Sequence, residues 1–374
     1  MRNTLICTVG TSLLNNLRRA EDASIKQAVE KKNWKNLSLL LLGKSNLERL
    51  CGAEINSITR ICSDSKVFEE RERLIFLVSD TEDGIQTGEL LKLYYQNRKN
   101  DFQFKNVEAR VLTGLRDDDV KAFKREGLKN FVREISQEVR KFSPEAIAIN
   151  ATGGYKAQIA FAGMIGQALE IPVYYLFEKF SEVIVLPPQP VALDLALWLD
   201  YYWFFERLES EEKLPKSEVE MLLDNESFSA LVDEEVKNGI SYVILSAMGL
   251  LFNERSRLQF AKQESTILSV IPKDDTPPEK KQIKLADDHH GKDVLKKFAK
   301  KIVRSPYVKK IVNSLSFKSQ ISEEIQRAKS DGIVEFFLTW TDAGYGLCIQ
   351  TTGRNQAETN TIAEHLKNEY SQKS

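Results

Sequence analysis

One stretch decides the fold of this chain: Asn150-Ala151-Thr152-Gly153-Gly154-Tyr155-Lys156-Ala157, which directly follows the apolar run of residues 146–149. This order predicts the end of a buried strand, a glycine turn and the start of a helix. At such a junction the glycines let the backbone approach a ligand, and the helix N-terminus attracts an anion. Lys156 adds a full positive charge. The stretch matches neither the P-loop nor the dinucleotide-binding glycine pattern, so it predicts a phosphorylated ligand of another kind.

Apolar runs alternate with amphipathic helical patterns through residues 1–190. Such alternation predicts an α/β domain with a Rossmann-like, mainly parallel sheet and helices on both faces. In sheets of this kind, ligands bind outside the carboxyl ends of the strands. The predicted strands are residues 4–8, 37–42, 74–78, 107–112, 146–149 and 173–177.

Two other predicted strands end in similar polar segments, Thr8-Val9-Gly10-Thr11-Ser12 and Ser79-Asp80-Thr81-Glu82-Asp83-Gly84. In a parallel sheet all three segments would lie along one edge, where their hydroxyls, glycines and lysine could form a phosphate or ribose site. Each segment alone is explained equally well as a helix cap, because Ser, Thr and Asp are ordinary N-caps. The agreement of three segments favours a ligand pocket. The candidate binding residues are Gly10, Thr11, Ser12, Asp80, Thr81, Thr152, Gly153, Gly154 and Lys156.

The overall composition is that of a globular protein with two or three domains. The chain has 374 residues, of which 42% are hydrophobic and 29% charged, and its net charge is −1. It contains no apolar run near the roughly 20 residues that a membrane span needs, and it starts with a strand pattern rather than a signal peptide. Its four cysteines are scattered, which argues against a disulfide framework and a structural zinc site. We therefore expect a cytoplasmic protein without a membrane partner or a bound metal.

The middle of the chain predicts a connector over residues 191–272. A proline-rich break at residues 187–190 leads into an aromatic helix at residues 192–206, which we expect to be buried against the first domain or a second subunit. Residues 217–257 resemble a small winged-helix unit of short helices and a possible strand. The segment is acidic, so a structural connector is favoured over a DNA-binding module.

Residues 273–374 predict a small α+β domain that begins with a linker. Two helices at residues 293–304 and 308–315 precede two strands at residues 332–340 and 346–352, joined by a turn, and a last helix follows at residues 356–370. Between residues 291 and 318 there are nine basic residues and one acid. This segment could bind a polyanion, although a solvated helix face is the simpler explanation.

The three strand-end segments together resemble a CARF domain, the sensor module of type III CRISPR systems, in particular its ring-nuclease branch. The resemblance implies that the protein binds a cyclic oligoadenylate across a homodimer interface, where a two-fold axis surrounds one symmetric ligand with two copies of each segment. Ser12 and Lys156 match the positions that ring-cleaving relatives use, so ring cleavage and simple binding stay open as alternatives. The residues implied to contact phosphates and riboses are Thr11, Ser12, Thr152, Gly153, Gly154 and Lys156.

The C-terminal domain resembles the RelE family of ribosome-dependent mRNA-cleaving toxins. The resemblance rests on Arg304-Ser305-Pro306, on the apolar strand pair and on Thr352-Gly353-Arg354 before the last helix. It implies a metal-independent enzyme that cleaves mRNA by attack of a 2′-hydroxyl on the adjacent phosphate. It also implies contacts with the ribosome, with the stalk as one candidate. That reaction needs positive charge on the phosphate and groups that move protons. The candidate catalytic residues are Arg354, Arg327, Lys329, Lys318 and His289.

Two positions depart from the RelE pattern. The arginine that the family often carries near the first strand of the pair is replaced by Ile333 or Val334, and the tyrosine of the last helix by Thr361 or Ile362. The assignment of acid and base therefore stays open. His289 lies in a charged loop, where a histidine is more often solvated surface than a catalyst.

Taken together, the sequence predicts a dimeric ribonuclease that a cyclic oligoadenylate activates, with the tetra-adenylate favoured by symmetry, and that arrests translation. The activator is the one small molecule expected, with no other cofactor. Two alternatives stay open. One is a ligand-controlled transcription factor that acts through the winged-helix-like middle. The other is a ring nuclease whose C-terminal domain is inactive.

Overall fold

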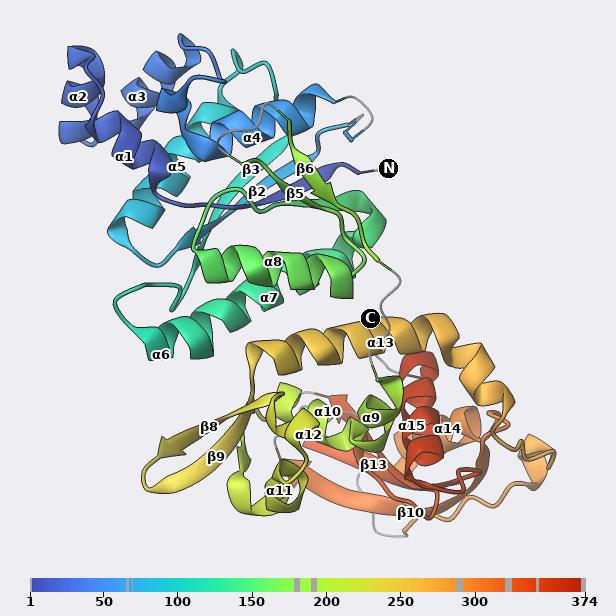
Figure 1. Ribbon diagram of the computed structural model, residues 1–374. Coiled ribbons are helices and arrows are strands. Elements are labelled where there is room, and N and C mark those ends of the chain that lie inside the picture. Colours follow the sequence, from blue (N-terminus) through green and yellow to red (C-terminus); the bar gives the residue numbers. More distant parts are fainter. Residues whose placement is uncertain are drawn as a thin grey trace. The chain divides into compact units, whose positions relative to one another are not determined.

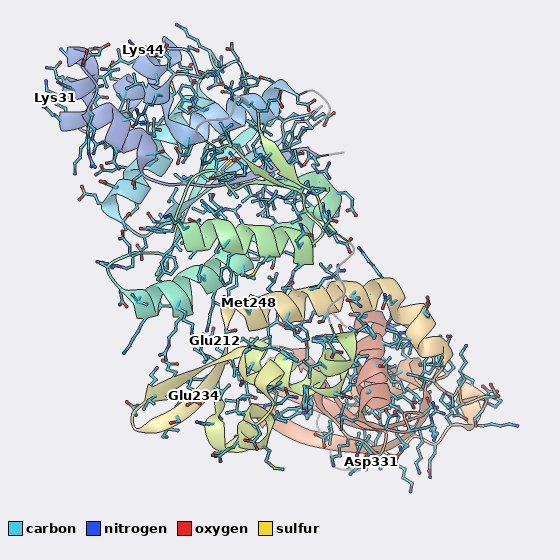
Figure 2. All side chains as sticks on the ribbon, viewed as in Figure 1. Lys31, Lys44, Glu212, Glu234, Met248 and Asp331 are labelled. Carbon is cyan, nitrogen blue, oxygen red and sulfur yellow. The ribbon has the colours of Figure 1, made fainter. Side chains whose placement is uncertain are left out.

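The computed structural model describes residues 2–64, 67–68, 70–177, 182–189, 194–286, 292–319, 325–340 and 343–370 (Figure 1). Figure 2 shows the side chains that are described, which exclude those of residues 210, 226–227, 316–319, 325–327, 339–340 and 343–344. The chain divides into two compact units. Unit 1 comprises Met1–Ala192 and Leu250–Glu254, and unit 2 comprises Leu193–Gly249 and Arg255–Ser374. A split of the second unit at residues 272–273 stays a prediction. None of the described helices is long and apolar enough to cross a membrane.

Unit 1 is built on a six-stranded, mainly parallel sheet, as the sequence predicts. The strand order is β3-β2-β1-β4-β5-β6, in which the first five strands are parallel and β6 is antiparallel. β1 is buried along its whole length, which is expected when helices cover both faces. The strands are β1 (Thr4–Thr8), β2 (Arg73–Ser79), β3 (Asn106–Leu112), β4 (Ile147–Asn150), β5 (Val173–Tyr175) and β6 (Ile184–Leu186).

Helices cover both faces of this sheet. Figure 1 shows α1 to α5 on one face and α7 and α8 on the other. The helices are α1 (Ser12–Arg18), α2 (Ala23–Glu30), α3 (Trp34–Leu42), α4 (Gly52–Ser63), α5 (Glu82–Gln96), α6 (Val120–Ala122), α7 (Leu128–Phe142) and α8 (Lys156–Ala168). Short turns η1 (Arg49–Cys51) and η3 (Pro144–Ala146) and a π-helical turn η2 (Phe123–Gly127) complete the unit.

The strand predicted at residues 37–42 is wrong, because these residues form most of α3. Asn33 caps the helix by accepting the N–H of Asn36. Leu37 and Leu41, one helical turn apart, are buried, whereas Leu39 is about half exposed. The run is rich in leucine and contains no β-branched residue, so helix propensity and the cap determine its structure.

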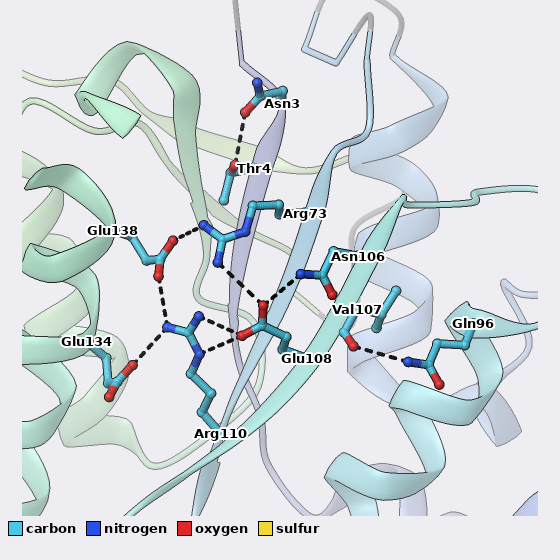
Figure 3. Close-up of polar contacts among 10 residues, drawn as sticks. All are labelled: Asn3, Thr4, Arg73, Gln96, Asn106, Val107, Glu108, Arg110, Glu134 and Glu138. Atoms are coloured by element: carbon cyan, nitrogen blue, oxygen red, sulfur yellow. Dashed lines mark hydrogen bonds and ion pairs between the residues drawn. The ribbon is translucent and has the colours of Figure 1, made fainter. Parts of the chain in front are cut away.

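An ion-pair network holds α7 on the face of β2 and β3 (Figure 3). Glu138 of α7 is 1% exposed and pairs with Arg73 of β2 and Arg110 of β3. Arg110 also pairs with Glu134 at 2.9 Å and with Glu108 at 2.6 Å. Each buried charge therefore has an opposite partner, which offsets the cost of removing it from water.

The first half of unit 2 contains short helices and a small antiparallel sheet of order β7-β9-β8. Strand β8 is acidic, and Figure 2 shows Glu234 on its hairpin; the role of this region as a connector stays a prediction. The elements are α9 (Leu195–Asp200), α10 (Tyr202–Ser210), β7 (Leu214–Pro215), α11 (Lys216–Leu223), α12 (Glu226–Ser229), β8 (Val232–Lys237), β9 (Ile240–Leu245) and α13 (Ala247–Ser269).

The predicted aromatic helix is divided at Tyr201 into α9 and α10, and its buried side chains contact other parts of unit 2. Trp198 packs against Phe260 of α13 with ring centroids 5.9 Å apart. Phe204 packs against Phe228 at 4.5 Å. These aromatic contacts lie within unit 2, and burial of the segment against the first domain or a second subunit stays a prediction.

The second half of unit 2 is an antiparallel sheet of order β10-β13-β12-β11 with a helix before and after it. The second helix predicted at residues 308–315 is wrong, because these residues begin strand β10. Val308 and Ile311 are buried and pair with β13, and the β-branched composition of the segment favours a strand. The elements are η4 (Pro278–Lys280), α14 (Lys292–Ile302), β10 (Val308–Ser319), β11 (Ile325–Ala328), β12 (Ile333–Trp340), β13 (Ala343–Thr351) and α15 (Gln356–Tyr370).

Candidate functional site

The carboxyl edge of the unit 1 sheet carries all three segments predicted from the sequence. Strand β1 lies between β2 and β4, so the direction of chain connection reverses between β1 and β4. This is the topological switch point, where parallel α/β sheets bind their ligands. Residues 9–11 follow β1, residues 151–155 follow β4, and residues 80–81 follow β2 on the next strand.

The two loops at the switch point touch through their glycines. A Cβ on Gly10 would lie 2.9 Å from the backbone nitrogen of Gly154, and a Cβ on Gly153 would lie 2.9 Å from the nitrogen of Gly10. Gly154 has φ of +100°, which favours glycine. These three glycines therefore allow the two loops to approach each other, whereas the sequence suggested that they allow a ligand to approach the backbone.

A buried acid, Glu54 of α4, joins both loops and was not found from the sequence. Its Oε1 accepts the N–H of Gly10 at 2.9 Å, and its Oε2 accepts the hydroxyl of Ser12 at 3.3 Å. A Cβ on Gly153 would overlap Oε1. Burial raises the pKa of Glu54, although the two donors oppose this rise. Glu54 belongs to no motif, so only its position in the fold reveals it.

The hydroxyl of Thr152 is used inside its own loop. It donates to Asn150 Oδ1 at 2.7 Å and accepts the N–H of Leu176 at 3.0 Å. Asn150 in turn donates to Ser57 of α4 at 2.8 Å. Thr152 is half-buried and orders the turn after β4.

The side chains of Asp80 and Thr81 also have local partners. Asp80 accepts the N–H of Gly114 at 3.1 Å. Thr81 caps α5 by accepting the N–H of Gly84 at 3.1 Å, and its hydroxyl lies 2.8 Å from that of Ser79. For this segment the helix-cap alternative describes the observed contacts.

Three candidate binding residues present side chains at the surface of this edge. Thr11 is half-buried before α1, Ser12 is exposed at the start of α1, and Lys156 is exposed as the first residue of α8. Among the described residues no acid lies within ion-pair distance of Lys156. The thirteen-residue helix α8 also directs its free N–H groups toward this edge. The combination of lysine, hydroxyls and helix N-terminus can bind an anion.

Two aromatic side chains also pack together next to the switch point. Tyr155, directly before α8, is half-buried and meets Phe123 edge to face with ring centroids 5.4 Å apart. Burial and the negative charge of Asp117 raise the pKa of its hydroxyl, which therefore stays protonated at neutral pH. Across the described residues no group of three His, Cys, Asp or Glu side chains is placed to hold a metal ion.

In unit 2, the structure brings two of the predicted catalytic positions near each other. Lys329 lies in the turn between β11 and β12, and Gly332 of this turn accepts the N–H of Thr351 at 2.8 Å. A Cβ on Gly332 would lie 2.8 Å from the carbonyl oxygen of Gly353, the neighbour of Arg354. The side chain of Arg354 is 60% exposed, but its Nε and Nη2 bind the carboxylate of Glu358 at distances of 2.6–3.1 Å.

Of the other predicted catalytic positions, Lys318 lies away from this turn, whereas Arg327 is next to it in the sequence. Lys318 lies on β10, and its backbone pairs with Gly344 at the far end of β13 from Thr351. Arg327 lies two residues before Lys329 on β11, which is the opposite edge strand from β10. At about 4.8 Å per strand, β10 and β11 are roughly 14 Å apart. The side chains of both residues, and all of His289, lie outside the described part of the chain.

The fold and the edge loops define the class of unit 1: a doubly wound α/β domain with a candidate ligand site at its switch point. A family model described as CRISPR-associated protein (Cas_APE2256) matches residues 49–189, which lie within this unit. The matched region contains Glu54 and the loops after β2 and β4.

Two solved structures align with most of the chain at low identity and with low TM-scores. Can2 from Sulfobacillus thermosulfidooxidans, in complex with cyclic tetra-adenylate, has 10% identity and a TM-score of 0.26, with 83% of this chain and 88% of Can2 covered. Protein VC1899 from Vibrio cholerae has 11% identity and a TM-score of 0.27, with 94% and 78% covered. TM-scores this low mean that large parts of the chains do not superpose.

Proposed function

We propose that unit 1 binds a cyclic oligoadenylate, with cyclic tetra-adenylate as the first candidate, at the carboxyl edge of its sheet. One observation carries the proposal: exposed Lys156, at the N-terminus of α8, shares the β1/β4 switch point with the hydroxyls of Thr11 and Ser12. These groups suit phosphodiesters, and a ligand with internal two-fold symmetry suits a homodimer that presents two such edges. The match of residues 49–189 to a CRISPR-associated family supports this ligand class.

The binding proposal is tested by titrating cyclic tetra-adenylate, cyclic hexa-adenylate and linear tetra-adenylate into the protein. Lys156→Ala should weaken binding of the preferred ring by about tenfold or more, because a hydrogen bond to a charged group contributes about 1.5–3 kcal/mol. Lys141→Ala is the matched control, because Lys141 is an exposed lysine at the end of α7, before the amino end of β4. Equal affinities for the two variants would refute the site.

The same edge also favours a second, slower activity, cleavage of the bound ring. Among the surface groups at the switch point, Ser12 could align a ribose 2′-hydroxyl and Lys156 could offset charge on its phosphate. Incubation of the protein with the labelled ring, without ribosomes, tests this activity. Linear products that disappear in both Ser12→Ala and Lys156→Ala would support it.

For unit 2 the proposal is a ribonuclease that the bound ring activates and that cuts mRNA on the ribosome, which arrests translation. Two features support it. The outer face of α14 carries exposed Lys296, Lys297, Lys300 and Lys301, a charge pattern that suits RNA phosphates. The turns of Lys329 and Arg354 adjoin each other, which would place two cations near one phosphate.

A translating extract supplied with cyclic tetra-adenylate tests this ribonuclease. Arg354→Ala should lower the rate of mRNA cleavage at least about tenfold, because the arginine would stabilise charge on the phosphate. Glu358→Gln is the matched control, because it also removes the Arg354–Glu358 ion pair but leaves the arginine. If both variants lose activity equally, Arg354 acts only through its partner. Intact mRNA together with bound duplex DNA would favour a transcription factor instead.

A further inference from the structure

The carboxylate of Glu54 is buried directly beneath the candidate anion site. The residue is 1% exposed and lies in the first turn of α4. Its two oxygens accept the N–H of Gly10 and the hydroxyl of Ser12, and no cation lies close enough to affect its pKa among the described residues. A carboxylate buried without a cation is costly. This cost points to a role beyond holding the two loops together.

Two ionisable groups face each other in this cluster, the carboxyl of Glu54 and the thiol of Cys7. Cys7 faces it from β1, and burial raises the pKa of this thiol so far that it stays protonated. The loop after β1 contributes the Ser12 hydroxyl, and the loop after β4 contributes the backbone of Gly153. Burial also raises the pKa of Glu54. A change of charge in this cluster is therefore a change on Glu54.

Ser12 connects this buried carboxyl to the surface. An ionised carboxylate is only an acceptor, so the Ser12 hydroxyl must donate inward and then presents only lone pairs to a ligand. A protonated Glu54 can instead donate from Oε2 to Ser12 Oγ. That arrangement frees the Ser12 proton for an acceptor outside the protein, such as a phosphate oxygen.

We infer that Glu54 is a positioning residue that takes up one proton when a phosphodiester ligand binds, and that this proton turns the Ser12 hydroxyl outward as a donor. The inference rests on the function proposed for unit 1. The proton comes from solvent, and no covalent bond between heavy atoms changes. The negative charge of the ligand favours the protonated carboxyl, since a like charge nearby raises the pKa of an acid. Affinity therefore rises as the pH falls.

Calorimetric titration of the full-length protein with cyclic tetra-adenylate measures this proton directly. Titrations at one pH in two buffers of different ionisation enthalpy should give an uptake of up to about one proton per chain. As the pH falls, the Kd should fall by up to about tenfold per pH unit. The buffer comparison with wild-type protein decides the question even if a variant fails to fold.

Two variants distinguish the effect of the proton on Glu54 from the effect of its hydrogen bonds. In Glu54→Gln the amide oxygen still accepts from Gly10 while the amide N–H donates to Ser12, so this variant mimics the protonated state. It should bind at least as tightly as the wild type, without proton uptake and without the pH dependence. Glu82→Gln, which changes an exposed acid at the same edge, should keep the wild-type uptake.

The possible failures are distinguishable. Wild-type binding without proton uptake, or an unchanged pH dependence in Glu54→Gln, would overturn the role of Glu54 and leave the proposed ligand standing. If the wild type binds no cyclic oligoadenylate at any pH, the proposed function fails and the inference fails with it.

Discussion

At the scale of single residues, Gly153 and Gly163 lie ten positions apart but in opposite surroundings. A Cβ on Gly153 would collide with Glu54 and with the backbone of Gly10, whereas a Cβ on Gly163 of α8 meets nothing within 4 Å. Gly153→Ala should therefore lower the free energy of unfolding by about 1–3 kcal/mol. Gly163→Ala should raise it by about 0.5–1 kcal/mol, because alanine favours a helix. Urea unfolding measures both, and a stable Gly153→Ala would contradict the loop contact.

At the residue scale, only part of the candidate site could be predicted from the sequence. Lys156 follows a glycine turn after an apolar run, so local order along the chain is enough to predict its place at a helix start. Glu54 is about 100 positions from that turn and meets it only because α4 lies against both loops. Contacts of this kind depend on tertiary packing, and no spacing in the sequence encodes them. The pairing of Arg354 with Glu358 differs, because residues four apart form a local pair that the sequence can indicate.

At the scale of elements, two wrong predictions have one physical origin. Residues 37–42 form a helix and residues 308–315 form a strand, and each was assigned to the other class. Residues 37–42 are a short apolar run and residues 308–315 mix apolar with polar residues, and in stretches this short periodicity does not separate a helix from a strand. Composition and caps do separate them here: leucines after the Asn33 cap favour α3, and β-branched residues next to exposed Lys309 and Lys310 favour β10. The parallel sheet was predictable because five of its six strands are well-bounded apolar runs.

At the scale of the whole molecule, the two units differ in how their buried charges are arranged. In unit 1 the network around Arg110 pairs each acid with an arginine, and Glu54 stands apart without a cation. In unit 2 a second buried cluster joins three helices, because Glu206 of α10 contacts Arg257 of α13 and Lys367 of α15. Acid should therefore act on the two units differently.

The buried cluster around Glu206 predicts that the free energy of unfolding of unit 2 falls in acid. Burial alone would raise the pKa of Glu206, but Arg257 and Lys367 lower it to about 2. A carboxyl with a lowered pKa contributes stability that is present above its unfolded pKa, near 4.5, and that is lost as the pH falls toward about 2. The loss is about 3 kcal/mol at most. Glu364 reduces it, because burial raises the pKa of that acid and its contribution has the opposite sign.

Denaturant unfolding between about pH 6 and about pH 2.5 measures this loss, followed by the fluorescence of Trp198 in a variant whose other tryptophans are replaced by phenylalanine. Glu206→Gln should unfold more easily at neutral pH, since it leaves two cations short of a partner, and should lose less stability in acid than the wild type. Glu234→Gln is the control, because Glu234 pairs with Lys216 at the surface of the same unit and such pairs contribute at most about 1 kcal/mol. Equal acid sensitivity of Glu206→Gln and the wild type would show that the buried cluster does not set the stability of unit 2 in acid.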